Sequence, residues 1–362
     1  MVYRPGVDPE LTDRGSARTP AVIAVDAMGG DHAPRTAVEG ALLAARRRGL
    51  RLLLVGRRSI LEEEIEEFGP GTAVRDRVEV VHAGEVVGMC ESALAVRRKR
   101  DSSVRVCARL VKEGRAQAMV TAGNTGAALV AGKMVIGVAP GVDRPALAVA
   151  MPRRVGRTIL LDAGANVDSK PDQLRQFAVM GHYLAQQLLR MNSPRIGLLS
   201  IGEEAGKGTD LVREVFKSLD ATGLNFVGNV EGRDVFSGAA DVVVCDGFVG
   251  NAILKSAEAL AEFVGAQLRE EMSRTLRSRL GYLLAKPAFD RFRSRVDYSE
   301  YGGAPLLGLR GGCFVAHGRS SAHAMSSAIQ RAVEFCEAGI HLKVSAKLSE
   351  VDFEAAPKAV AG

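Results

Sequence analysis

The chain has 362 residues, of which 47% are hydrophobic, and a formal net charge of +6, so it can bury one large core or two smaller ones. Its five cysteines are odd in number and include no CxxC pair, which disfavours a disulfide framework or a zinc site and favours reduced thiols in the cytoplasm. Residues 1–20 are polar and lack an apolar core. We expect a flexible tail there rather than a signal peptide or a membrane anchor.

Apolar runs alternate with helical patterns at intervals typical of βαβ units. The expected strands are Ala21–Val25, Leu50–Val55, Val78–His82, Ala118–Thr121, Ala146–Met151, Thr158–Asp162, Arg195–Ile201, Asn225–Val227, Ala240–Cys245 and Phe314–His317. The expected helices include Thr36–Arg48, Ser102–Gly114, Pro171–Arg190, Leu211–Ala221 and Ser321–Ala338. This order predicts a Rossmann-like three-layer α/β/α fold with a mainly parallel sheet. Polar turns follow the strands, so we expect the functional site at one carboxyl edge of the sheet.

The first strand runs into the turn AVDAMGGDHAP, which ends at Pro34. Gly29 and Gly30 permit a sharp turn close to a ligand, and the N-terminus of the following helix favours an anion. Carboxylates would repel phosphate, so we expect Asp26 and Asp31 to bind backbone N–H groups or to order neighbouring side chains. The alternative is an ordinary strand-to-helix turn with Asp31 near the cap.

This turn resembles the N-terminal signature of the bacterial phosphate acyltransferases, the PlsX family, which make acyl phosphate from acyl carrier protein and inorganic phosphate. Later segments resemble the same family from about residue 21 to about residue 340. The resemblance implies one catalytic domain over residues 21–341 and a homodimer, with no cofactor. It places Gly29, Gly30, Asp31 and His32 in the phosphate or substrate site.

A basic run, Arg97 to Arg100, precedes the pair Ser102 and Ser103. One interpretation is a solvated turn before a serine-capped helix. In the family a basic stretch ending in two serines occupies this place, so the other interpretation is that Arg97, Arg98 and Lys99 contact the acidic carrier protein or a membrane. Residues 89–93 lack the proline and one of the acids that are usual in the family.

The turn TAGNTG, residues 121–126, is similar to the family's SAGNTGA segment. The amide of Asn124 and the hydroxyl of Thr125 offer donors to a phosphate or thioester oxygen. An Asn-Thr pair that only caps the next helix would have the same sequence. The chain contains no GxGxxG dinucleotide fingerprint, which disfavours a nicotinamide-dependent dehydrogenase of similar fold.

The segment LDAGANVD, residues 161–168, resembles the family's LDxGANVD motif. Asp162, Asn166 and Asp168 could be metal ligands, but short polar residues at this spacing are more common in turns. The family chemistry needs no metal, so we predict no metal site and assign these three residues to the substrate site.

Two further strand ends carry the expected catalytic residues. The loop IGEEAGKGTD, residues 201–210, fails the P-loop pattern, yet its Lys207 can offer a point charge to phosphate. Lys207 could instead be a surface lysine, and the resemblance favours the phosphate contact. Asn251, which enters a long helix after VVVCDGFVG, could donate to an oxyanion or to phosphate, or could be only a cap. We interpret Cys245 as structural.

Residues 274–295 contain six arginines, Lys286 and a single acid. Their charge equals that of the whole chain, so the rest is close to neutral and nucleic-acid binding is not indicated. Glycine and proline interrupt the segment, which predicts a protruding hairpin of two basic amphipathic helices joined at a kink. It could contact a membrane, the carrier protein or a partner subunit. The expected contact residues are Arg277, Arg279, Leu283, Leu284 and Lys286.

The segments YGGAPLLGLRG and HG, the latter at His317, resemble the end of the family's pattern. His317 could be a general acid for the departing thiol, or a structural histidine at a strand end. We expect residues 342–362 to form a loosely held tail.

The resemblance as a whole implies an acyltransferase of phospholipid biosynthesis, cytoplasmic and peripherally bound to the membrane. Its partners would be acyl carrier protein, inorganic phosphate, a second subunit and the downstream membrane glycerol-3-phosphate acyltransferase. A noncatalytic scaffold for carrier protein and membrane is the alternative of a different class.

Overall fold

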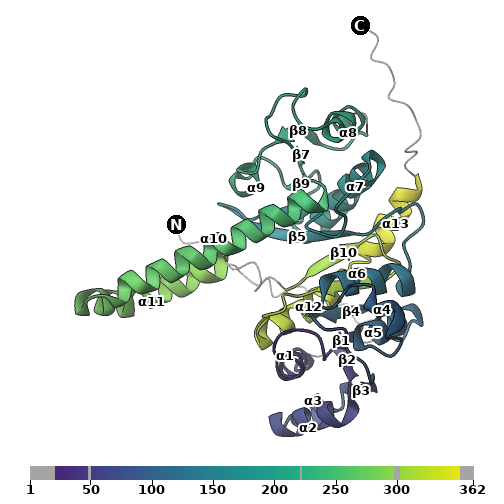
Figure 1. The fold of residues 1–362 in the computed structure, drawn as a ribbon, viewed down its shortest axis with the longest axis vertical. Helices are drawn as coiled ribbons and strands as arrows, with labels where there is room; N and C mark the ends of the chain where they lie inside the picture. The colour runs from purple at the N-terminus through teal and green to yellow at the C-terminus, as the bar shows by residue number, and fades with distance from the viewer. Residues whose placement is uncertain (1–20, 48–49, 221, 297–301, 351–362) are drawn as a thin grey trace.

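The computed structural model describes residues 21–47, 50–220, 222–296 and 302–350, so both expected terminal tails lie wholly or partly outside the described residues. These residues form a sheet of 11 strands with helices on both faces (Figure 1). The strands are β1 (Ala21–Asp26), β2 (Leu50–Gly56), β3 (Val78–His82), β4 (Ala118–Thr121), β5 (Ala146–Pro152), β6 (Arg157–Leu161), β7 (Ile196–Leu199), β8 (Phe226–Val230), β9 (Val242–Val244), β10 (Ala304–Leu307) and β11 (Gly312–Val315). The three-layer α/β/α prediction is therefore confirmed.

Two sets of helices cover the sheet. One face carries α1 (Arg35–Ala45), α2 (Arg58–Phe68), α7 (Pro171–Leu188), α8 (Asp210–Asp220), α12 (Ala322–Glu337) and α13 (Ile340–Glu350). The other carries α4 (Ala95–Arg98), α5 (Ser103–Lys112), α6 (Thr125–Ala131), the π-helical turn η2 (Gly132–Ile136), α9 (Asp234–Ser237) and the start of α10 (Gly247–Ser273). The short helix α3 (Thr72–Arg75) and the long α11 (Leu276–Val296) complete the described helices.

The strand order is β3-β2-β1-β4-β11-β10-β5-β6-β9-β7-β8. The pairs β11–β10, β10–β5 and β5–β6 are antiparallel, whereas the other pairs are parallel. Three reversals mean that β1, β4 and β11 run opposite to β6, β9 and β7. The expectation of one common carboxyl edge is therefore wrong, because β5 and β6 pair antiparallel. Strand β10, which sequence analysis missed, adds two reversals that cancel between β11 and β5. We call the carboxyl ends of β1, β4 and β11 the first edge, and those of β6, β9 and β7 the second edge.

The C-terminal tail is shorter than the sequence analysis predicts. Helix α13 continues to Glu350, and its residues Ile340, Val344 and Leu348 are buried. Their spacing of four residues gives the helix one apolar face, which packs against α7. The prediction of a loose tail is wrong for residues 342–350.

The protruding hairpin is present, but its two arms differ from those predicted. Residues 276–296 form the single helix α11, with Pro287 inside it, and its partner is α10, which lies beside it and extends away from the body (Figure 1). Leu283 is 68% and Leu284 is 77% exposed. An interior proline removes one backbone donor and usually kinks or breaks a helix, yet α11 continues through Pro287. None of the described helices combines the length and apolarity needed to cross a membrane.

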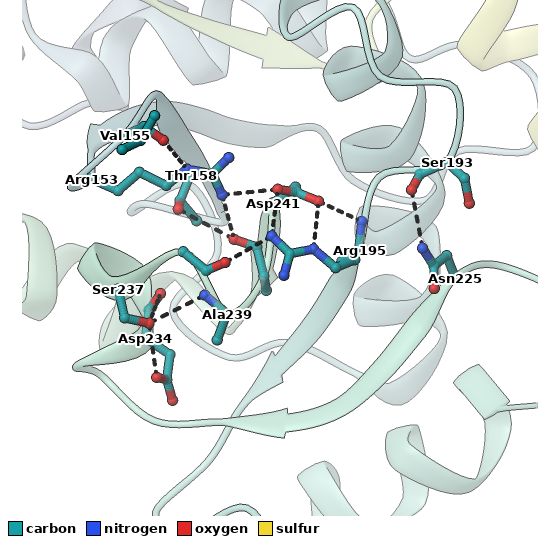
Figure 2. A network of polar contacts seen from close by, with 12 residues as sticks. Arg153, Val155, Thr158, Ser193, Arg195, Asn225, Asp234, Ser237, Ala239 and Asp241 are labelled. Carbon is teal, nitrogen blue, oxygen red and sulfur yellow. Dashed lines mark hydrogen bonds and ion pairs between the residues drawn. The ribbon is translucent and has the colours of Figure 1, made fainter.

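A network of ion pairs joins the segments that precede β6, β7 and β9 (Figure 2). The carboxylate of Asp241, before β9, accepts bonds of 2.9 Å from Arg153 and of 3.0 and 3.1 Å from Arg195. Arg153 follows β5 and Arg195 precedes β7. Burial alone would raise the pKa of the Asp241 carboxyl, but the bonds from Arg195 and Arg153 outweigh it and lower this pKa to about 2.

We expect Asp241→Asn to lower the free energy of unfolding by about 3 kcal/mol at pH 7, because it removes the buried anion shared by the largely buried Arg153 and the partly exposed Arg195. The folded pKa lies below the usual 3.8, so the contribution of Asp241 is complete above about pH 4 and is lost as the pH falls towards 2. Urea denaturation of both proteins at several pH values measures this. The difference in free energy of unfolding between wild type and variant should become smaller as the pH falls. Asp76→Asn, at an exposed position, is the control. Equal stability of wild type and variant at pH 7 would contradict the role.

Candidate active site

The first edge is organised around the buried carboxylate of Asp26, at the end of β1. Asp26 accepts the hydroxyl proton of Thr121, with 2.7 Å between the oxygens, and the Met28 N–H at 3.3 Å. The Thr121 oxygen in turn accepts the N–H of Gly123 at 2.9 Å. Asp26 thus binds backbone N–H, as expected, and joins the turns after β1 and β4. Burial raises the pKa of the Asp26 carboxyl, although hydrogen bonds from Ser103, Thr121 and the Met28 amide act in the opposite direction.

Glycine is required where these two turns touch. A Cβ atom on Gly29 would lie 2.8 Å from the Asp26 carboxylate and 2.8 Å from the backbone nitrogen of Gly123. Gly30 has a backbone φ of +111°, which residues with a side chain rarely adopt. The next residue, Asp31, donates its N–H to the carbonyl of Gly318 at 2.8 Å. The turn after β11 therefore joins the other two. The side chains of Asp31 and His32 are exposed.

Asn124 is the N-cap of α6, accepting the N–H of Ala127 at 3.0 Å. Its amide nitrogen donates to the carbonyls of Met89 and Glu91, at 3.2 and 2.8 Å. Both amide hydrogens therefore already have acceptors in the loop before α4. Thr125, next in the chain, is exposed. The first edge thus contains a fourth segment, residues 88–91, held by Asn124.

The basic run lies beside this loop. Lys99 donates to Glu91 at 2.7 Å and to the Val86 carbonyl at 2.7 Å, while Arg97 and Arg98 are exposed. Ser102 occupies the N-cap position of α5, but its hydroxyl donates to the carbonyl of Lys99 instead of capping the helix. The expected serine cap is therefore absent at Ser102. Lys99 orders the loop, and the two exposed arginines are left to face solvent.

His317 connects the first edge to helix α10. Its Nδ1 accepts the N–H of Arg319 at 3.1 Å, and its Nε2 lies 4.0 Å from a carboxylate oxygen of Glu258. An imidazole that accepts at Nδ1 carries its proton on Nε2 when neutral, so that proton faces Glu258. Sequence analysis missed Glu258, because nothing in a long helical pattern indicates which residue meets a distant strand end.

On the second edge, Asp162 shapes the turn after β6. It is fully buried and accepts five N–H bonds of 2.7–3.1 Å from backbone and side-chain donors of Leu147, Gly164, Ala165 and Asn166. Burial raises the pKa of its carboxyl, and these bonds oppose the rise. Asn166 is buried and also donates to the Pro145 carbonyl at 2.8 Å. The side chains of Asp162 and Asn166 therefore stabilise the turn by hydrogen bonds. The side chain of Asp168 is exposed.

No group of three side chains able to hold a metal ion occurs among the described residues. The oxygens of Asp162 are occupied by N–H donors, which a metal ligand would have to exchange. The thiol of Cys245 is buried and donates to the Asp162 carbonyl at 3.4 Å. Burial raises the pKa of this thiol well above its ordinary value, which fits a structural cysteine.

Helix α10 starts in contact with the turn after β6. A Cβ atom on Gly250 would lie 1.9 Å from the Asp162 carbonyl oxygen, so only glycine fits. Asp246 caps the helix by accepting the Val249 N–H at 3.0 Å. Asn251 is therefore not the cap. It is exposed as the fifth residue of α10, beside Gly164, and within the described residues its amide makes no hydrogen bond.

Lys207 lies in the loop after β7. Its backbone N–H donates to the Glu204 carbonyl at 3.0 Å, and its side chain is exposed. In the part of the chain that the structure describes, its ammonium group forms no ion pair or hydrogen bond. Strands β6, β9 and β7 are neighbours in the sheet, so Asp162, Asn251 and Lys207 follow three adjacent strand ends, each about 5 Å from the next strand.

The two edges meet along α10. Asn251 is on the second edge, and Glu258, seven residues later, approaches His317 on the first edge. At about 1.5 Å per residue this separation is about 10 Å. A substrate of that length could contact both edges at once.

Comparison with known proteins identifies relatives over most of the chain. The sequence pattern of a family described as "fatty acid synthesis protein" matches residues 21–343. A phosphate acyltransferase of Acidobacterium capsulatum is 50% identical over 325 residues, which cover 90% of this chain and 96% of the relative. The phosphate acyltransferase of Geobacter sulfurreducens is 47% identical and covers 94% of this chain and 99% of its own.

A solved phosphotransacetylase from Streptococcus pyogenes superposes with a TM-score of 0.59 at 18% identity, covering 91% of this chain and 94% of its own. This likeness establishes the fold alone. The sequence relatives are far closer, and they span nearly the whole described region. The chain therefore belongs to the phosphate acyltransferase family, a family of acyltransferase enzymes.

Proposed function

We propose that this protein transfers the acyl group of a fatty acyl thioester, delivered by acyl carrier protein, to inorganic phosphate. The product, acyl phosphate, would feed phospholipid synthesis. The observation that carries the proposal is the 50% identity to a phosphate acyltransferase over 90% of this chain. The polar groups of the second edge support it, because they match what the reaction needs.

The reaction needs positioning more than a nucleophile from the protein. A phosphate oxygen attacks the thioester carbonyl carbon, a C–O bond forms, and the carbonyl oxygen becomes an oxyanion. The C–S bond then breaks and the carrier thiolate leaves. Phosphate is itself the nucleophile, so no covalent enzyme intermediate is required. The protein must hold two anionic reactants together and stabilise the oxyanion.

We assign phosphate binding to Lys207 and donation to the oxyanion or to phosphate to Asn251. Both polar groups are exposed and without partners within the described residues, and both follow strand ends of the second edge. We also propose that six residues contact the substrate: Gly29, Gly30, Asp31, His32, Thr125 and Asp168.

Four further residues have polar atoms that already bind or face protein atoms, and we propose that they position the turns of the site. They are Asn124, Asp162, Asn166 and His317. His317 in particular presents its proton to Glu258. A thiolate leaves without a general acid, so the reaction does not require that proton.

We further propose that the hairpin of α10 and α11 brings the enzyme to the membrane and to a second subunit. Leu283 and Leu284 on α11, with Arg277, Arg279 and Lys286, suit an anionic lipid surface. Leu260 and Phe263 on α10, each 62% exposed, suit contact with another copy.

Leu283→Asp/Leu284→Asp should reduce flotation with vesicles rich in anionic phospholipid at least about tenfold, because burying two carboxylates in lipid is costly. Leu342→Asp, at a 64% exposed position on α13, is the matched control and should float like the wild type. Unchanged flotation of the double variant would argue against the membrane contact, and a monomer in sedimentation equilibrium would argue against the dimer.

Gly29→Ala should lower acyl transfer at least about tenfold, because its Cβ would push the turns after β1 and β4 apart, and small displacements of bound groups are costly in catalysis. Gly71→Ala is the control, since a Cβ there meets nothing within 4 Å. Steady-state rates of thiol release by the two variants measure the effect. Full activity in Gly29→Ala would mean that the first-edge turns do not position substrate.

The central experiment measures thiol release from long-chain acyl carrier protein with and without inorganic phosphate, and detects the product by mass. We expect release only with phosphate, and acyl phosphate as the product. No turnover by folded protein across chain lengths would favour a noncatalytic scaffold for carrier protein and membrane.

Two variants then separate the roles in the same assay. Lys207→Ala should raise the KM for phosphate about tenfold or more, because it removes the cation that binds phosphate. Asn251→Ala should lower kcat about a hundredfold, the usual effect of losing an oxyanion donor. Lys217→Ala, an exposed lysine on α8, is the control. An unchanged dependence on phosphate in Lys207→Ala would disprove its assignment.

A further inference from the structure

A basic cleft lies between α5 and η2, outside the residues assigned above. Its volume is about 550 Å³. Four cations line it, Arg100, Arg105, Arg109 and Lys112, together with Glu113 and the apolar Met134. We call it the α5 cleft. The catalytic proposal uses none of these residues, so their concentration of positive charge needs another explanation.

The positive charge of the cleft is scarcely neutralised within the chain. Arg109 lies 4.0 Å from Glu113, and both side chains are about half exposed. Within the described residues, Arg100 and Lys112 form no ion pair or hydrogen bond. An exposed pair at 4.0 Å contributes little, so the cleft attracts an anionic partner.

Arg105 is held in place by the protein. Its guanidinium donates to the carbonyls of Val96 and Arg97, each at 3.0 Å. A guanidinium has five N–H donors, so these two bonds orient the group and leave donors for a ligand. The cleft is thus ordered on the side of α4 before any partner binds.

The spacing of the cations fits a helical protein surface. Arg105, Arg109 and Lys112 are at positions i, i+4 and i+7 of α5, one face of the helix that extends over about 10 Å. Acidic side chains at the same spacing on a second helix would meet them. Met134, 42% exposed, provides an apolar contact between the charges. A concave surface of this kind suits a protruding helix better than a flat membrane.

The cleft also leads to the first edge. Helix α5 starts at the buried Ser103 and packs against β1, the strand that ends at Asp26. Arg100 lies only three residues before Ser103. Arg109 and Lys112, six and nine residues further along α5, lie about 9 and 14 Å from that end of the helix. A protein docked along α5 would therefore have one end next to the strand ends where a thioester has to enter.

We propose that the α5 cleft docks an acidic helical surface of the carrier protein that delivers the acyl thioester. This inference rests on the proposed function and adds the location of the carrier. It differs from the contacts expected at Arg97, Arg98 and Lys99 and at the hairpin, because it assigns the carrier to Arg105, Arg109 and Lys112.

The test compares Arg109→Glu/Lys112→Glu with Arg213→Glu/Lys217→Glu. The control pair is on α8, where Arg213 is also exposed and paired with a nearby acid, Asp210. Carrier protein bearing its free thiol is titrated into each full-length protein at low and high salt. The α5 variant should raise the Kd at least tenfold at low salt and lose most of the salt dependence, whereas the control should match the wild type.

Activity gives a second readout. The KM for long-chain acyl carrier protein should rise at least tenfold in the α5 variant, whereas kcat/KM for the same acyl group on pantetheine, which lacks the protein, should stay unchanged. An equal loss with both thioesters would overturn docking and indicate damage to the catalytic site. A wild-type Kd in the α5 variant, or loss of carrier binding only in Arg277→Glu/Arg279→Glu, would also overturn it.

Failure of the proposed function gives a different result. The wild type would then release thiol from neither thioester, yet titration of the carrier would still report on the cleft. Absence of carrier binding by the wild type would overturn the inference whatever the activity. Loss of anionic vesicle binding in the α5 variant, with carrier binding intact, would identify the cleft as a lipid contact and overturn it as well.

Discussion

The contact between Gly250 and the carbonyl of Asp162 is the constraint on which the candidate site depends. It brings the first turn of α10 against the turn after β6, closer than any side chain would allow. From there the helix passes from the second edge to the first, where Glu258 approaches His317. The sheet itself separates the two edges, because three antiparallel pairs reverse its direction. Helix α10 therefore contacts both edges, which the strand directions place apart.

Two buried aspartates play matching parts at the two edges. Asp26 and Asp162 each end a parallel strand, and each uses its carboxylate to gather N–H or O–H donors of a glycine-containing turn. Burial disfavours the charge in both and raises the pKa of each carboxyl, and the hydrogen bonds offset this rise only in part. Neither carboxylate is therefore offered to a ligand. They fix the backbone around the site that we propose for the anionic substrates.

The electrostatics of the chain divide into separate surfaces. One is α11 with its arginines and exposed leucines, and another is the α5 cleft. The turns of the candidate site carry the exposed carboxylates of Asp31 and Asp168, and within the described residues the ammonium group of Lys207, on the loop after β7, has no partner. Such an arrangement lets anionic partners approach from outside, while hydrogen bonds hold the turns from which the proposed reacting groups project. The ion-pair network at Asp241 belongs to neither surface. It joins the amino ends of β7 and β9, whereas the candidate site lies at their carboxyl ends.

The sequence by itself determined most of the strands, the α/β class and the turns that follow the strand ends, because apolar periodicity and glycine placement are local properties. It also led to the family through motifs such as AVDAMGGDHAP and LDAGANVD. Only the tertiary structure decided that the strand ends form two edges, that Asn124 is engaged by the loop before α4, and that Glu258 meets His317. These depend on the antiparallel pairing of β5 with β6 and on contacts between residues far apart in the chain, which no local pattern encodes.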